Sequence, residues 1–202
     1  MNPPTIASVV EGEGELDALP VVLRRLAYAA EIWDVNVRPP HLVDRGRLTK
    51  PGGIESAVES VARRIPNGAP GGILVLIDAD DDCPASLGPS LLARAAKARS
   101  DRLLSVVLAN REFEAWFIAA APSLGGYAGL PDGLEIPQDC EKPRDCKGWL
   151  SKHRTDGGKY SPRVDQAALA HTFDLDLARE NSDSFGKFCR DVTYLLTGKR
   201  AS

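Results

Sequence analysis

The sequence of 202 residues predicts an α/β fold in which helices flank a parallel sheet in a Rossmann-like arrangement. Apolar β-type runs alternate with helical patterns between residues 5 and 121, which is typical of doubly wound folds. One run, Ile73 to Ile77, is entirely apolar and therefore suits a central strand that is covered on both faces. We expect an α/β domain over residues 1–121 and an irregular, then mainly helical extension over residues 122–202 packed on it.

Each element has its own signal. The expected strands cover residues 5–10, 35–43, 73–77 and 103–109. Helical periodicity predicts helices over residues 16–30, 54–65, 89–98 and 113–121, and in the extension over 147–152, 164–172 and 184–196. Pro39 and Pro40 remove two ladder donors from the second strand, so we expect it at an edge of the sheet.

Carboxylates follow two of the expected strands directly. Glu11 comes after the first strand, and Asp78 and Asp80 end the apolar run. Because the carboxyl ends of parallel strands meet at one edge of the sheet, we expect these three side chains to converge. Carboxylates so close together repel one another unless a cation lies among them. Their hard oxygen ligands favour Mg²⁺ or Mn²⁺.

More acids lie near these strand ends. Glu15 and Asp82 extend the two acidic stretches, and Glu112 and Glu114 follow the fourth strand. Glu112 and Glu114 suit either a helix N-terminus or a second metal ion. The aspartate run also has a purely structural interpretation, a polar turn after a buried strand.

Charge is unevenly distributed. The whole chain has a net charge of −3 and a pI near 5.7, so it lacks the global basic surface of many nucleic-acid binders. Residues 142–163 nevertheless hold seven cations against two anions. The cations are Lys142, Arg144, Lys147, Lys152, Arg154, Lys159 and Arg163. An acidic metal site with a basic segment elsewhere suits an enzyme that acts on phosphates, although a solvated basic loop explains the segment equally well.

Several other classes of protein find little support. Gly12 and Gly14 lack the third glycine of a dinucleotide-binding turn, and glutamates flank them. The aspartate run has Cys83 where a calcium loop needs glycine. The sequence has only three histidines and no nucleophile elbow, so a Ser-His-Asp relay is unsupported.

The cysteines and the N-terminus indicate a cytoplasmic protein. Four scattered cysteines do not make a disulfide framework, so we expect reduced thiols. Cys140, Cys146 and His153 leave a zinc site open, against two ordinary loop cysteines. The first residues lack the layout of a signal peptide, and no apolar run approaches the length of a membrane span.

The three acidic motifs together resemble the Toprim superfamily, and most closely its stand-alone Toprim-like proteins of unknown function related to OLD-family nucleases. The likeness covers roughly residues 5–121. It implies divalent metal and phosphodiester chemistry on nucleic acid, with DNA favoured over RNA. Matched by motif, it implies metal ligation by Glu11, Asp78 and Asp80, with Glu15, Asp82, Glu112 and Glu114 as further acids. OLD nucleases carry a fused ATPase that this chain lacks, so the resemblance implies a separate ATPase partner, as in defence-related two-component systems.

These observations favour a metal-dependent nuclease or related phosphodiester-processing enzyme. Two ions about 4 Å apart would activate water and stabilise the leaving oxygen. The first ion would be held by Glu11, Asp78 and Asp80, and the second by Glu15, Asp82, Glu112 and Glu114. Lys147, Lys159 or Arg111 would neutralise the phosphate, and Lys147 is our candidate catalytic cation. One alternative is a phosphatase or transferase that uses Asp78 and Asp80 without Glu11. Another is a non-catalytic subunit that binds nucleic acid or an ATPase.

Overall fold

The structure, a computed structural model, describes residues 2–142 and 144–200. It confirms the predicted α/β class. A parallel sheet of five strands has the order β2-β1-β4-β5, with β3 also pairing with β1. The strands are β1 (Thr5–Val10), β2 (Asn36–Val37), β3 (His41–Leu42), β4 (Gly71–Asp78) and β5 (Leu103–Ala109).

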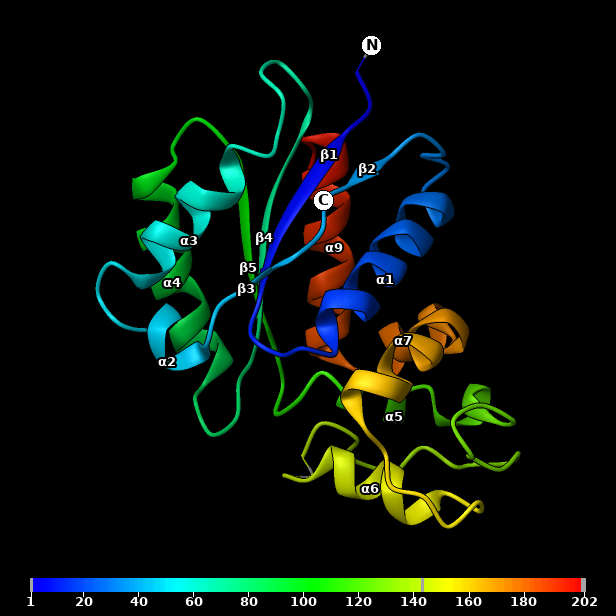
Figure 1. Cartoon of the computed structure of the whole chain (residues 1–202). Coiled ribbons are helices and arrows are strands. Elements are labelled where there is room, and N and C mark those ends of the chain that lie inside the picture. The colour runs from blue at the N-terminus through cyan, green and yellow to red at the C-terminus, as the bar shows by residue number, and fades with distance from the viewer. Residues whose placement is uncertain (1, 143, 201–202) are drawn as a thin grey trace.

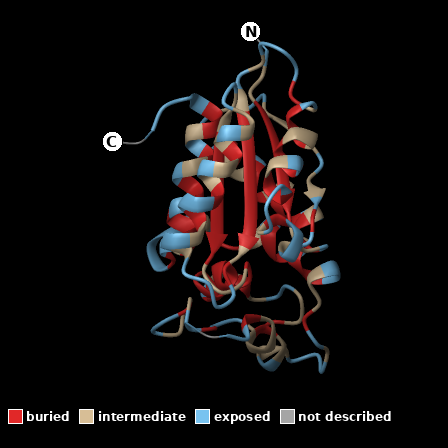
Figure 2. Ribbon diagram, turned by 90° about the vertical axis from the view of Figure 1, so that its left-hand side faces the viewer, coloured by how far each residue is buried: buried red, intermediate tan, exposed pale blue. Residues whose placement is uncertain are grey.

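Helices cover both faces of this sheet (Figure 1). Helices α1 (Glu15–Ala29) and α9 (Asp183–Thr197) lie on one face, and α3 (Gly53–Ala62) and α4 (Pro84–Ala98) lie on the other. Strands β1, β4 and β5, between the two layers, are almost wholly buried (Figure 2). Alternate residues of β4 explain the apolar run, because Leu74 and Leu76 join the core on the α1 side while Ile73, Val75 and Ile77 join the core on the α3 side.

The remaining helices are shorter. They are α2 (Arg45–Leu48), α5 (Ala115–Ile118), a 3₁₀ turn η1 (Ala121–Leu124), α6 (Cys146–His153), α7 (Pro162–Thr172) and α8 (Leu175–Asn181). In Figure 1, α5, α6 and α7 lie beyond the carboxyl ends of the strands. The chain then returns through α9 to pack on β4 and β5. The extension therefore forms a wall beside the edge of the sheet where the acids lie.

Some expected boundaries differ from those observed. The expected strand over residues 35–43 is two short strands, β2 and β3, separated by the two prolines and paired with β1. Helix α4 begins at Pro84, five residues before the expected start, and accommodates Pro89 within it. The helix expected over 113–121 is only the short α5, followed by the 3₁₀ turn. Helix α8, which Asp174 caps, was not expected.

Among the described residues, none of the helices combines the length and apolar character required to cross a membrane.

Candidate functional site

Glu11 and Asp78 meet at the carboxyl edge of the sheet. Strands β1 and β4 are parallel neighbours, with Val9 paired to Val75, so both chains leave the sheet side by side. The backbone N–H of Asp78 donates a hydrogen bond of 2.7 Å to Oε1 of Glu11. The convergence of these two acids, remote in sequence, is present in the structure.

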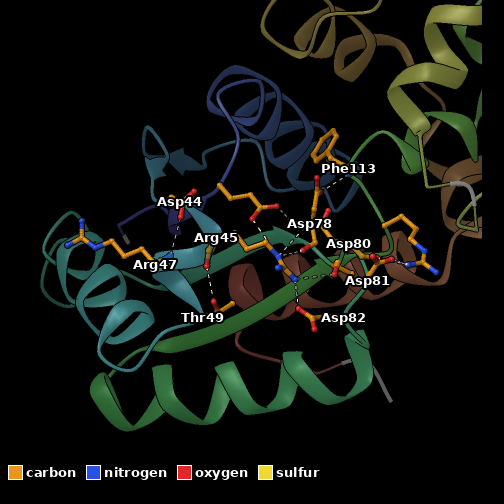
Figure 3. Close-up of polar contacts among 12 residues, drawn as sticks. Asp44, Arg45, Arg47, Thr49, Asp78, Asp80, Asp81, Asp82 and Phe113 are labelled. Atoms are coloured by element: carbon orange, nitrogen blue, oxygen red, sulfur yellow. Dashed lines mark hydrogen bonds and ion pairs between the residues drawn. The ribbon is translucent and has the colours of Figure 1, made fainter.

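Asp78 is also tied to the segment after β5. Its Oδ1 accepts a hydrogen bond of 2.7 Å from the backbone N–H of Phe113, as Figure 3 shows. One oxygen of Glu11 and one of Asp78 are thus bound to amides, which fixes both carboxylates. The second oxygen of Glu11, Oε2, is buried and has no hydrogen-bond partner; its nearest cation is Arg45, with Nε 4.0 Å away. A buried carboxylate oxygen without a donor is a strong candidate for binding a cation or proton.

A cavity of about 490 Å³ opens above this pair. Its charged lining comprises seven acids and three cations. The acids are Glu11, Glu13, Glu15, Asp44, Asp78, Asp80 and Glu114, and the cations are Arg45, Lys147 and Arg163. We call this cavity the acidic pocket. Ser161 and Pro162, at the start of α7, form part of its wall, so the extension helps to enclose it.

Four acids of the pocket have raised pKa values. Burial, followed by the negative charges of Glu15 and Asp80, raises the pKa of Glu11 to about 7, although the Asp78 amide and Arg45 oppose the shift. Burial and the neighbouring Glu15 and Glu114 raise the pKa of Asp78 well above its usual value. Burial likewise raises the pKa values of Glu15 and Glu114. Clustered carboxylates with raised pKa values are a recognised feature of functional sites.

Arg45 is the main residue of the site that sequence reasoning missed. It donates from Nε to the carbonyl of Asp78 and from Nη2 to that of Ala79, each at 3.1 Å, and pairs with Asp82 at 2.5 Å. Its Nε also lies 3.5 Å from Asp80 (Figure 3). The signal was its position, since it follows β3 and therefore emerges at the same edge as the acids. A guanidinium here holds the turn after β4 in place.

Lys147, on α6, reaches the pocket from the other side. Its Nζ lies 2.9 Å from Oε2 of Glu112 and 3.1 Å from Oε2 of Glu114. Burial alone would lower the pKa of Lys147, but Glu114, Glu112 and Asp78 outweigh it and raise the pKa. Tyr160 completes the surroundings of Glu114 with a hydrogen bond of 3.1 Å from its hydroxyl. Lys147 is therefore a permanent cation among these carboxylates.

The remaining sequence candidates are divided. Glu15 and Asp80 line the acidic pocket, and Oε2 of Glu15 accepts the Gly12 amide at 2.8 Å. Glu112 lines a neighbouring cavity, and Asp82, paired with Arg45, lines neither of these two cavities. The four acids expected at a second metal ion thus do not line one cavity: Lys147 pairs with Glu112 and Glu114, and Arg45 pairs with Asp82. Of the three candidate phosphate-binding cations, only Lys147 lines the acidic pocket.

Comparison with known families matches residues 10–193 to a domain of unknown function, DUF4276. The chain belongs to the DUF4276 family. The match spans every acid and cation of the pocket, from Glu11 to Arg163. No curated protein and no solved structure matches the chain significantly.

The ligand chemistry of this DUF4276 chain fits a hard divalent cation. Glu11, Asp78 and Asp80 offer carboxylate oxygens, and one of them, Oε2 of Glu11, is buried without a donor. Within residues 2–142 and 144–200, no three His, Cys, Asp or Glu side chains already stand in a metal-holding arrangement. Binding would therefore require the side chain of the exposed Asp80 to turn toward the other two.

The other candidates from the sequence have defined partners. The Cys140 thiol donates to the carbonyl of Asn181, and the ring of His153 lies against Trp149 with ring centroids 3.9 Å apart, so both side chains contact protein groups. The basic segment is largely paired with acids, as in the bonds of Arg154 to Asp156. Those pairs leave less positive charge for nucleic acid than the sequence alone indicates.

Proposed function

We propose that this DUF4276 protein is a divalent-metal-dependent phosphodiester-processing enzyme, a nuclease that acts on nucleic acid and on DNA in preference to RNA. The observation that carries the proposal is the pairing of Glu11 and Asp78 in the acidic pocket, with Oε2 of Glu11 buried and without a donor. Backbone amides fix one oxygen of each carboxylate, and the second oxygen of Glu11 is left for a bound cation.

The charge balance of the pocket supports this proposal. Seven acids face three cations, and burial, with neighbouring negative charge as a smaller cause, raises the pKa values of four of the carboxyl groups. An acidic pocket repels a phosphate unless an added cation reverses the local charge. A phosphodiester substrate therefore requires the metal at this place.

Glu11, Asp78 and Asp80 would hold one Mg²⁺ or Mn²⁺. When bound, the metal would polarise the phosphate and lower the pKa of an attacking water. Lys147, held between Glu112 and Glu114, supplies positive charge from the opposite wall without a second ion at those acids. We therefore favour a single metal ion with a lysine over the two-metal arrangement. Lys147 would bind the non-bridging oxygens of the phosphate, and Glu112 and Glu114 would position it.

The deciding experiment compares wild-type protein with Glu11→Gln. Glutamine keeps an oxygen that can accept the Asp78 amide, so the fold is preserved while the charge is lost. We expect the wild type to bind Mn²⁺, measured by electron paramagnetic resonance, and to nick supercoiled plasmid. In the variant both properties should be lost. Asp34→Asn, which removes an exposed acid between α1 and β2, is the matched control and should change neither property.

One observation favours a second candidate function, a non-catalytic subunit that binds nucleic acid or a separate ATPase. Arg45 and Lys147 already neutralise part of the acidic cluster, as they would in a site that never receives a metal. Under this alternative, the wild type would bind no Mn²⁺ in the millimolar range, and Asp78→Ala would leave partner binding intact.

A phosphatase that uses Asp78 would instead keep its turnover in Glu11→Gln.

A further inference from the structure

Two arginines converge on one carboxylate beside the acidic pocket. Nη1 of Arg111 lies 2.9 Å and Nη2 of Arg144 lies 3.0 Å from the same oxygen, Oδ1 of Asp81. Arg111 follows β5, Arg144 precedes α6, and Asp81 follows β4. Three separate segments thus bring two guanidinium groups to one anionic point.

The backbone holds Arg111 in place independently of Asp81. Asp80 and Arg111 both have positive φ angles, 49° and 66°, which are uncommon for residues other than glycine. The N–H of Asp80 donates to the carbonyl of Arg111 at 3.0 Å, and Nη1 of Arg111 donates to the carbonyl of Asp80 at 2.7 Å. Backbone strain of this kind clusters at ligand-binding sites. The Arg111 side chain would consequently stay in position if the Asp81 carboxylate moved away.

A second cavity, of about 260 Å³, lies at this point. It is lined by Asp80, Asp81, Arg111, Glu112 and Arg144. The cavity shares Asp80 with the acidic pocket, so the two are adjacent. Of the other two acids of the lining, Glu112 is paired with Lys147 at 2.9 Å, and Asp80 lies 3.5 Å from Nε of Arg45. Asp81 is therefore the acid that neutralises the two arginines, and its side chain is 68% exposed and can move into solvent.

We propose that Arg111 and Arg144 form a second phosphate subsite, which binds a phosphodiester next to the one in the acidic pocket. Asp81 occupies this subsite as an internal anion until a nucleic-acid strand displaces it. Guanidinium groups bind phosphate oxygens in pairs of charge-assisted hydrogen bonds, whereas an exposed ion pair with a carboxylate is weak, so the exchange favours the strand. The inference rests on the proposed action on nucleic acid and identifies how that strand is held.

The test is a gain of affinity in Asp81→Asn. Binding of a fluorescein-labelled single-stranded DNA is measured by fluorescence anisotropy without metal at low salt. We expect Asp81→Asn to bind about three to ten times more tightly than wild type, because both guanidinium groups are released. The double substitution Arg111→Gln with Arg144→Gln should bind at least about tenfold more weakly and show a shallower dependence on salt. Arg144→Gln alone changes only an exposed side chain, so it tests the subsite in a variant that should fold like the wild type even if the double variant does not.

Asp101→Asn is a matched control for net charge. Asp101 also holds two arginines, Arg99 at 2.7 Å and Arg102 at 3.4 Å, but at the start of β5, the opposite end of the strand. The proposal predicts no tightening in this variant. Equal gains in Asp81→Asn and Asp101→Asn, or no gain in either, would overturn it. Tightening toward a mononucleotide as large as that toward the oligonucleotide would also overturn it, since the ligand would then be a free phosphate.

Failure of this inference can be told apart from failure of the proposed enzyme. Mn²⁺ binding and nicking depend on Glu11, whereas the affinity without metal depends on Asp81 and the two arginines. If Asp81→Asn gains affinity while the wild type binds no Mn²⁺, the phosphate subsite stands and the nuclease fails. If Mn²⁺ binding and nicking are present but the Asp81 and arginine variants bind DNA like the wild type, only the subsite fails.

Discussion

Acids at two ends of the same sheet behave in opposite ways. Near the start of β5, Asp101 forms two hydrogen bonds with Arg99, and these lower its pKa to about 2. At the carboxyl edge, Glu11 and Asp78 are buried among other acids, and their pKa values are raised. The first arrangement is a satisfied surface ion pair. The second leaves a deficit of positive charge that only a proton or a bound cation removes, which is why we assign function to this edge.

The strongest way to test that contrast is to neutralise one acid at each end. Asp78→Asn removes a carboxylate that the proposed metal needs, so we expect nicking activity to fall by at least about 100-fold. Asp101→Asn removes the same charge from a satisfied pair and should leave activity within about twofold of wild type, because that pair has little effect beyond the surface. Initial rates with saturating Mn²⁺ measure both. Equal losses in the two variants would mean that activity depends on net charge and not on the pocket.

Two lysines, one paired with a buried acid and one with an exposed acid, should differ in their contribution to the stability of the protein. Lys147 neutralises Glu114, whose side chain is only 1% exposed, whereas Lys142 pairs with the exposed Asp139. Lys147→Ala leaves the buried charge of Glu114 without its cation. Because the lysine itself is 41% exposed, we expect the free energy of unfolding to fall by about 2–3 kcal/mol, less than the full value for a buried pair. Lys142→Ala should cost at most about 0.5 kcal/mol. Urea denaturation at neutral pH measures both free energies of unfolding.

Glu114→Gln in the Lys147→Ala background provides the internal check. If the cost comes from the uncompensated charge of Glu114, the second substitution should recover most of it. If the cost comes from lost packing of the lysine stem, the double variant should remain as unstable as Lys147→Ala alone.

The sequence predicted the acids at the strand ends of the site but not the neighbouring residues Arg45 and Tyr160. Glu11 and Asp78 could be placed together because parallel strands deliver their carboxyl ends to one edge, a rule that needs only the order of strands and helices. Arg45 could not be assigned, because its contacts depend on how the short β3 lies against β1. Tyr160 could not be assigned either, because it lies in an irregular segment of the extension whose sequence has no periodic pattern, and its hydroxyl reaches Glu114 only in the folded chain. Local pattern therefore gives the sheet, while long-range packing decides which cations meet which acids.

Two glycines, one in the wall of the acidic pocket and one in α4, differ in how tightly their surroundings are packed. Gly14 has ordinary helical angles, φ −65° and ψ −35°, so alanine meets no backbone strain there. A Cβ would nevertheless lie 1.9 Å from Oε1 of the buried Gln166 and 2.9 Å from Pro162. Gly14→Ala should destabilise the protein by about 1–3 kcal/mol and loosen the wall of the pocket. Gly88→Ala, in α4, has its nearest atom at 3.5 Å and should be neutral or stabilising by up to about 1 kcal/mol.

The stability of the protein should also depend on pH, and Glu11 gives this dependence a definite sign. The folded protein holds a proton on Glu11 up to about pH 7, while the unfolded chain releases it near its usual value of 4.5. Between these two pKa values the native state binds more protons than the unfolded state, so this group makes stability fall as the pH rises, by at most about 1.4 kcal/mol per pH unit. Glu11→Gln should remove that component, which is measured as the difference between wild-type and variant unfolding free energies from about pH 4.5 to pH 8. Added Mn²⁺ should oppose the fall in wild type alone, because the metal and the proton compete for the same carboxylate. A difference that stays constant with pH, with and without Mn²⁺, would show that Glu11 is as well satisfied as Asp101 and would remove the contrast between the two ends of the sheet.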